Sequence, residues 1–257
     1  MINPICTSQQ YQINNTNFKA RPLGGYDYLL PQKLTIYQLE QTDINYIQPI
    51  LNNLEKFFKK YDVDGESARQ VMAEGLSASI AILKSLEEKV RILMAFCDNT
   101  PSSLVIGNAL KLDKNGGFHF SSRAEHGLNE GEADWVVTFN KDIPSEGKAT
   151  LNEFFHKLLD DKFESCFVRS ELPEKSSAVK FYTKMGFKKL SENPRPILRE
   201  NDYCYAIGKY DDKADEIIPM LATRADILDV TKKQDILLKR RELDSGCSCK
   251  LPEFTFD

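Results

Sequence analysis

The sequence predicts an α/β or α+β domain with helices packed on both sides of a mixed sheet, that is, a three-layer domain. Short apolar or alternating runs, typical of strands, recur along the chain, and stretches with helical spacing separate several of them. The apolar fraction of 41% and charged fraction of 28% are those of an ordinary globular protein. The 257 residues are enough for one large domain with appendages.

The predicted domain begins at the strand in KLTIYQL, where apolar and polar residues alternate. Two helices follow at 42–58 and 66–89, and Pro49 is expected to kink the first of them or to mark its start. The remaining elements are expected in this order: strands at 90–99, 103–112 and 133–139, a helix at 148–163, a strand at 165–171, a helix at 176–186, and strands at 187–190 and 202–210.

The two ends of the chain are expected to lie outside this domain. Residues 1–30 are rich in Asn, Gln and Thr, which suits an extended arm or irregular cover. Helical segments at 213–222 and 224–243 lead to a tail that contains cysteine. The expected division is an arm at 1–30, a domain at 31–210, and a C-terminal helical extension with tail at 211–257.

Charge and hydropathy argue against several classes of protein. The net charge is −4 and the basic residues are dispersed, so no field that would hold nucleic acid is expected. No apolar run approaches the length of a membrane span, and the first residues lack the pattern of a signal peptide. We therefore expect a cytoplasmic protein that binds neither nucleic acid nor membrane.

The cysteines and histidines predict no metal site and no disulfide framework. Cys97, Cys166 and Cys204 lie within apolar runs, where free thiols pack as small hydrophobic groups. Cys247 and Cys249 form a single CxC without a second pair. The two histidines at 119 and 126, near a glutamate at 125, match no metal-ligand spacing and are interpreted as a solvated cluster.

The stretch SSAVKFYTKMGFKKL, residues 176–190, contains the first candidate for catalysis. Phe181, Tyr182 and Met185 fall on one stripe of a helix, and Gly186 occupies the place of a left-handed C-terminal cap. The spacing alone makes Tyr182 a core tyrosine with a bonded hydroxyl. The alternative is a proton donor in a ligand cleft.

The segment PSEGKA, residues 144–149, precedes a predicted helix and is a candidate anion site. The first turn of a helix leaves N–H groups without internal partners, and its dipole favours an anion. Gly147 would let the backbone approach a ligand closely, and Lys148 adds a positive charge. An ordinary turn with a serine cap would explain the same residues.

Together the two segments resemble the GNAT superfamily of acyl-CoA-dependent N-acyltransferases. SSAVKFYTKMGFKKL is similar to the family's A-x-x-(F/L)-Y-x-K-x-G-F segment, and PSEGKA lies upstream where the family has its Q/R-x-x-G-x-G/A loop. The resemblance covers residues 34–210 and includes the order of elements. It implies an α/β/α domain around a mixed, mostly antiparallel sheet, with acetyl-CoA as acyl donor and no metal.

The resemblance also implies where the coenzyme would bind. The loop Ser145–Thr150 would hold the pyrophosphate, and the strand at 134–139 would pair with the pantetheine arm and offer a backbone N–H to the oxyanion. The expected coenzyme-binding residues are Val137, Phe139, Ser145, Glu146, Gly147, Lys148, Ala149, Thr150 and Ser177.

Three residues are expected to carry the chemistry. Tyr182 matches the tyrosine that protonates the departing thiolate. The general base of the family is a carboxylate near the start of the fourth strand, and Glu132 and Asp134 are available there. Asp134 is the first choice, and the alternative for both is a solvated loop residue.

Two departures from the family pattern keep a second hypothesis open. Pro144 stands where the family has Gln or Arg, and Lys175 stands where it commonly has Asn. The alternative is therefore a GNAT-like scaffold that has lost catalysis and acts as a binding or interaction module. Acidic residues in the acceptor-facing segments favour a cationic amine, either a small molecule or a protein lysine or N-terminus. The C-terminal helices are candidates for dimerisation.

Overall fold

A computed structural model describes residues 20–29, 31–40, 43, 90–109, 130–138, 143–170, 177–189, 218–243 and 251–252. The described strands are β1 (Arg21–Tyr26), β2 (Leu34–Leu39), β3 (Val90–Cys97), β4 (Thr100–Ala109), β5 (Glu130–Thr138), β6 (Ser165–Ser170), β7 (Lys188–Lys189), β8 (Ile218–Thr223) and β9 (Arg240–Glu242). The described helices are α4 (Glu146–Asp160), α5 (Ser177–Lys184) and α7 (Arg224–Leu237).

These strands form one sheet in the order β7-β8-β6-β5-β4-β3-β2-β1-β9. Within the described part of the chain, β5 and β6 are the one parallel pair, and every other neighbouring pair is antiparallel. The predicted α/β class with a mixed, mostly antiparallel sheet is confirmed. The helices expected at 42–58 and 66–89 and the strand expected at 202–210 lie outside the described residues, apart from Asp43.

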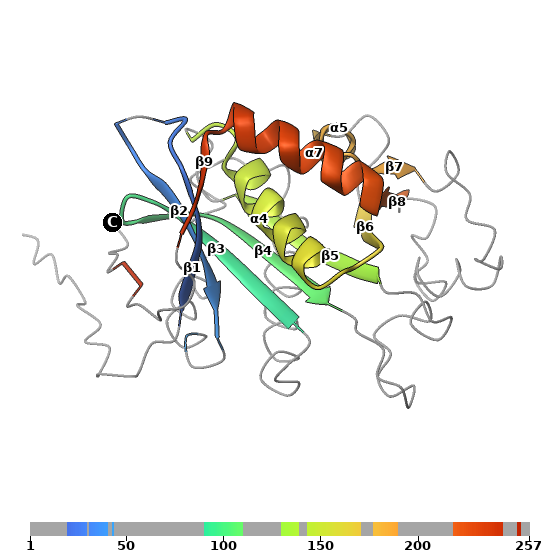
Figure 1. Cartoon of the computed structure of the whole chain (residues 1–257), viewed down its shortest axis with the longest axis horizontal. Coiled ribbons are helices and arrows are strands. Elements are labelled where there is room, and N and C mark those ends of the chain that lie inside the picture. The colour runs from blue at the N-terminus through green and yellow to red at the C-terminus, as the bar shows by residue number, and fades with distance from the viewer. Residues whose placement is uncertain are drawn as a thin grey trace, which may run out of the picture.

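Helix α4 packs on the middle of the sheet because its apolar side is fully buried. Phe154, Phe155 and Leu158 have no exposed surface. Gly107 of β4 lets the helix approach, because a Cβ there would lie 2.3 Å from a ring carbon of Phe154. Helix α7 packs against α4 (Figure 1) and carries the chain from β8 to β9 at the opposite edge of the sheet.

The first strand corrects the expectation that residues 1–30 form an arm. Arg21–Tyr26 pair with β2 on one side and with β9 on the other. The sequence RPLGGY hides this strand because Pro and Gly are rare in strands, and the register indeed shifts between Pro22 and Gly24.

The C-terminal region also differs from expectation. The helix predicted at 213–222 is wrong for Ile218–Thr223, which form β8 between β6 and β7. A short apolar run such as IPMLAT cannot be assigned to helix or strand by periodicity alone. The helix predicted at 224–243 is confirmed but ends at Leu237. No helix among the described residues is long and apolar enough to cross a membrane.

Candidate functional site

The N-terminus of α4 lacks a side-chain cap. The helix begins at Glu146, two residues before the predicted start at 148. Its N-cap, Ser145, has a left-handed backbone with φ of 65° and makes no capping hydrogen bond with its side chain. The Ala149 N–H donates to the Ser145 carbonyl at 3.0 Å. The three preceding N–H groups, of residues 146–148, have no carbonyl within the helix to bind.

Close packing surrounds this first turn. A Cβ on Gly147 would lie 2.9 Å from Cγ2 of Thr138 and 3.7 Å from a ring carbon of Phe181. Gly147 is thus required where the end of β5, the start of α4 and helix α5 meet. Ala149, the second small residue of the motif, is fully buried. The small residues of PSEGKA therefore have a packing role within the chain itself.

Tyr28 fixes the loop before α4 from the other side. Its hydroxyl donates to the Pro144 carbonyl at 2.6 Å, and its ring packs against the main core. Burial raises the pKa of Tyr28 well above its usual value, and the nearby Glu146 carboxylate raises it further. Burial also raises the pKa of the Cys97 thiol, with added contributions from Asp98 and Glu146. The Glu146 side chain, 2% exposed, therefore lies on the inner side of the first turn, toward Tyr28 and Cys97.

Thr150 and Lys148 face different surroundings. The Thr150 hydroxyl donates to the Glu146 carbonyl at 3.0 Å and lies 2.5 Å from the Ser103 hydroxyl of β4. Both hydroxyls are buried, so the Thr150 side chain ties α4 to the sheet. Lys148 is half-buried.

Strands β5 and β6 part after a short paired segment. Their parallel pairing joins Glu130–Glu132 with Ser165–Phe167 and does not continue beyond these described residues. On its other side β5 stays paired with β4 as far as Thr138. Among the described residues, no strand pairs with the β6-facing edge of β5 from Ala133 to Thr138, and this unpaired edge runs toward the first turn of α4.

A bulge in β5 lies where β5 and β6 separate. The register with β4 steps from Ile106 opposite Trp135 to Gly107 opposite Ala133, which leaves Asp134 without a partner in the ladder. Bulges bend a strand and redirect its side chains, and they are common beside active sites. The backbone of Asp134 therefore lies where β5 turns away from β6.

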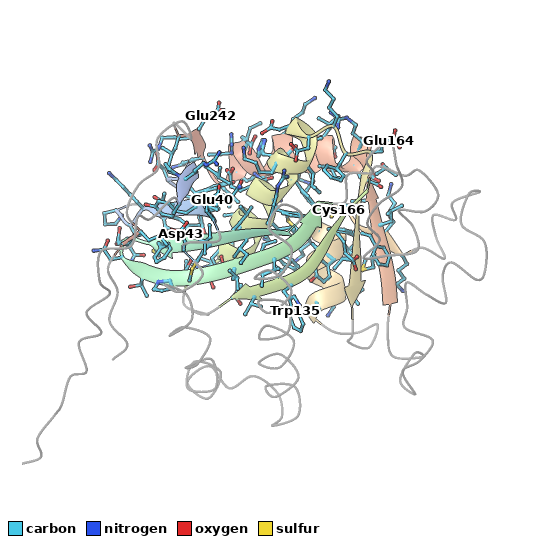
Figure 2. All side chains as sticks on the ribbon, turned by 90° about the horizontal axis from the view of Figure 1, so that it is seen from below. Glu40, Asp43, Trp135, Glu164, Cys166 and Glu242 are labelled. Carbon is cyan, nitrogen blue, oxygen red and sulfur yellow. The ribbon has the colours of Figure 1, made fainter. Side chains whose placement is uncertain are left out.

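Glu132 and Trp135 lie on the face of β5 opposite α4. A Cβ on Gly131 would collide with Leu158 of α4, and Ala133 belongs to the same core, so Glu132 between them points away from α4. Trp135, half-buried, projects from the side of the sheet away from α4 and α7 in Figure 2. Glu132 is 7% exposed and Val137 is 2% exposed.

Comparisons with known proteins give a likeness of fold only. No family model matches the sequence, and no curated protein does. The PaiA N-acetyltransferase from Thermoplasma acidophilum, solved with coenzyme A, is 15% identical, with a TM-score of 0.45 over 74% of this chain and 98% of that one. A putative GNAT acetyltransferase from Desulfovibrio desulfuricans is 9% identical, with a TM-score of 0.45 over 73% and 96%. The ribosomal-protein-S18-alanine N-acetyltransferase from Escherichia coli is 12% identical, with a TM-score of 0.42 over 74% and 93%. The fold of this chain is similar to that of GNAT acetyltransferases.

Tyr182, the candidate proton donor of a GNAT site, lies at the edge of the core. It is 8% exposed and meets the rings of Phe181 and Phe187 edge-on, with centroids 5.3 Å and 5.5 Å away. The predicted left-handed cap is confirmed, because Gly186 has φ of 86° and the Phe187 N–H donates to the Tyr182 carbonyl at 3.1 Å. This burial fits the core interpretation, and the role as proton donor stays a prediction.

The structure brings part of the predicted GNAT site together. The first turn of α4, the end of β5 and Phe181 of α5 converge around Gly147. Phe139 lies outside the described residues, and only the backbone of Asp134 and Ser177 is placed. In the described part of the chain, no group of three or more His, Cys, Asp or Glu residues could hold a metal.

Sequence reasoning missed Tyr28 at this site. The residue was assigned to an arm, and 116 positions separate it from Pro144. No local pattern links the two segments, since the contact depends on the pairing of β1 with β2 and on the place of α4 on the sheet. The one local sign that Tyr28 has a role at this site is that it is a tyrosine within a polar, glycine-containing stretch.

Proposed function

We propose that this protein transfers an acetyl group from acetyl-CoA to a primary amine. The observation that carries the proposal is the unpaired edge of β5, which leads to the first turn of α4, a turn without a side-chain cap. N–H groups at a helix start bind phosphate oxygens, and an unpaired strand edge can pair with an extended chain of amides. Pyrophosphate and pantetheine are linked in this order in coenzyme A.

The coenzyme would be held mainly by the backbone. The N–H groups of Glu146, Gly147 and Lys148 would meet the pyrophosphate, and the pantetheine amides would pair along β5 near Val137. The flanking residues proposed to line the coenzyme are Phe139, Ser145, Ala149, Thr150 and Ser177. Backbone contacts suit this chain because Pro144 offers neither a side-chain donor nor an N–H.

The transfer requires two proton movements. The amine nitrogen forms a bond to the acetyl carbon, the carbon–sulfur bond breaks, and a backbone N–H of β5 stabilises the oxyanion between these steps. Asp134 at the bulge, or Glu132 beside it, would take the proton from the amine. Tyr182 would give a proton to the leaving thiolate. The acidic residue types at positions 132 and 134 favour a cationic amine, either a small molecule or a protein lysine or N-terminus.

A second candidate is a binding module with the same fold and no catalysis. The observation that favours it is Glu146, whose buried carboxylate lies in the first turn of α4, where it opposes the binding of an anion. The two candidates differ in turnover, since only the first releases free CoA thiol.

Calorimetric titration with acetyl-CoA and CoA tests the proposal directly. Binding raises the melting temperature by mass action, and Trp135, the chain's only tryptophan, lies beside the proposed pantetheine path and should change its emission. Release of CoA thiol with a panel of amines supports the transferase. Binding without thiol release supports the module, and no binding at millimolar coenzyme contradicts the transferase.

Substitution of Tyr182 by Phe separates catalysis from packing. If Tyr182 is the proton donor, the substitution removes the reacting hydroxyl and keeps the ring. Turnover should then fall about 100-fold while coenzyme affinity is kept. Equal losses of turnover and affinity would assign the residue to packing alone.

A further inference from the structure

The loop before α4 adopts a conformation that its own residues do not explain. Ser145 is not glycine, yet its φ of 65° lies in the left-handed region that other residues avoid. Its hydroxyl makes no capping bond that would compensate. Such backbone persists only where surrounding structure imposes it.

Two hydrogen bonds enclose Ser145. On one side the Tyr28 hydroxyl donates to the Pro144 carbonyl at 2.6 Å, and on the other the Ala149 N–H donates to the Ser145 carbonyl at 3.0 Å. The second bond belongs to the helix, and among the described residues Tyr28 supplies a hydrogen bond from outside it. Tyr28 lies two residues after the end of β1, and its ring and Ile143 pack against the same core. The Tyr28 phenol therefore links the end of β1 to this loop.

The bond from Tyr28 does not occupy the first turn of α4. It ends on a carbonyl oxygen that precedes the helix and does not involve the N–H groups of residues 146–148. The phenol must stay protonated to donate, and the raised pKa of Tyr28, caused by burial and by Glu146, keeps it protonated at neutral pH.

We infer that Tyr28 is a positioning residue that holds Pro144 and Ser145 in the conformation that receives the pyrophosphate of the coenzyme. The inference rests on the proposed function, because it assigns a part of the same coenzyme site. Tyr28 would replace, by a contact from the neighbouring hairpin, the polar side chain that Pro144 cannot supply. Its effect is confined to the pyrophosphate end, far from the bond that breaks.

Substitution of Tyr28 by Phe removes the hydroxyl and keeps the ring. Loss of one hydrogen bond that orders the loop should weaken CoA binding about 3- to 10-fold in calorimetry. The transfer rate from S-acetylpantetheine, which has the thioester but no pyrophosphate, should be unchanged. With acetyl-CoA the KM should rise and kcat should stay the same. A general structural defect would affect both donors equally.

Tyr37→Phe is the matched control. Tyr37 lies on β2, is half-buried, and meets the ring of Phe96 edge-on at 5.7 Å, a contact that Phe preserves. This variant should bind CoA as the unchanged protein does. Unaltered or tighter CoA binding by Tyr28→Phe, or equal losses with both donors, overturns the inference. Absence of CoA binding by the unchanged protein contradicts the proposed function instead.

Discussion

Helices α4 and α7 start in opposite ways. At α7 the Thr223 hydroxyl accepts from the Asp226 N–H at 3.3 Å, and the Asp226 carboxylate accepts from the Thr223 N–H at 3.1 Å, a complete capping box. At α4 the N-cap is Ser145, a residue type that caps well, yet its side chain makes no such bond. The first turn of α7 is closed by a side-chain capping box, whereas the first turn of α4 has no side-chain cap.

Buried polar contacts in the middle of α4 hold this helix in place although its N-terminus has no side-chain cap. Glu153, 1% exposed, accepts from the Tyr26 hydroxyl at 2.8 Å and from Arg240 at 2.6 Å and 3.2 Å. Asn152 donates to Asp235 of α7 at 2.8 Å. Burial, followed by the charge of Glu153, raises the pKa of Tyr26 well above its usual value. This cluster ties α4 to β1, α7 and β9, so α4 is anchored without a cap.

The largest loss of stability should follow from removing the ion pair between Arg240 and Glu153. Arg240→Met leaves the Glu153 carboxylate buried without its cationic partner, which should lower the free energy of unfolding by about 3–5 kcal/mol. Urea denaturation measures this change. Arg241→Met is the matched control, because Arg241 pairs with Asp27 at the surface and should change stability little. Equal losses for both variants would mean that α4 is anchored elsewhere.

The second largest loss of stability tests the close packing around Gly147 at the N-terminus of α4. Gly147→Ala places a Cβ 2.9 Å from Cγ2 of Thr138, and overpacking of this kind costs about 1–3 kcal/mol. Thermal and urea unfolding report the loss. Thr138→Ser removes the methyl group that collides, so the double variant should recover most of the stability. No recovery would place the strain in the backbone instead of the side-chain contact.

Local signals predicted α4, α5 and the cap at Gly186, since helical spacing and glycine positions act over a few residues. The missing cap at Ser145 could not be predicted in this way, because residue type alone predicts that it caps. The bond from Tyr28 to Pro144 depends on contacts across the chain, as does the pairing of β1 with β9.

Smaller changes in stability are expected from substitutions at the two N-caps, Thr223 and Ser145. Thr223→Ala removes one half of the capping box and should cost about 1 kcal/mol. Ser145→Ala removes a hydroxyl that makes no capping bond, so it should leave stability nearly unchanged. The pair of urea midpoints measures the difference. A loss at Ser145 equal to that at Thr223 would contradict the contrast between the helices.

The smallest effect is a pH dependence at the start of α7. Burial alone would raise the pKa of Asp226, but hydrogen bonds from Lys188 and Thr223 outweigh it and lower the pKa below its usual value. A depressed pKa means that the carboxylate stabilises the folded state above the unfolded pKa of about 4, and that this contribution is lost as the pH falls through the folded pKa. Asp226→Asn should therefore be less stable than the unchanged protein at pH 7, and the difference in stability should shrink as the pH falls through the folded pKa of Asp226. Ser145→Ala should show no such convergence, because the start of α4 does not depend on a capping carboxylate. If the difference in stability between Asp226→Asn and the unchanged protein stays constant with pH, the effect comes from packing. The contrast between the capped start of α7 and the uncapped start of α4 would then have no electrostatic part.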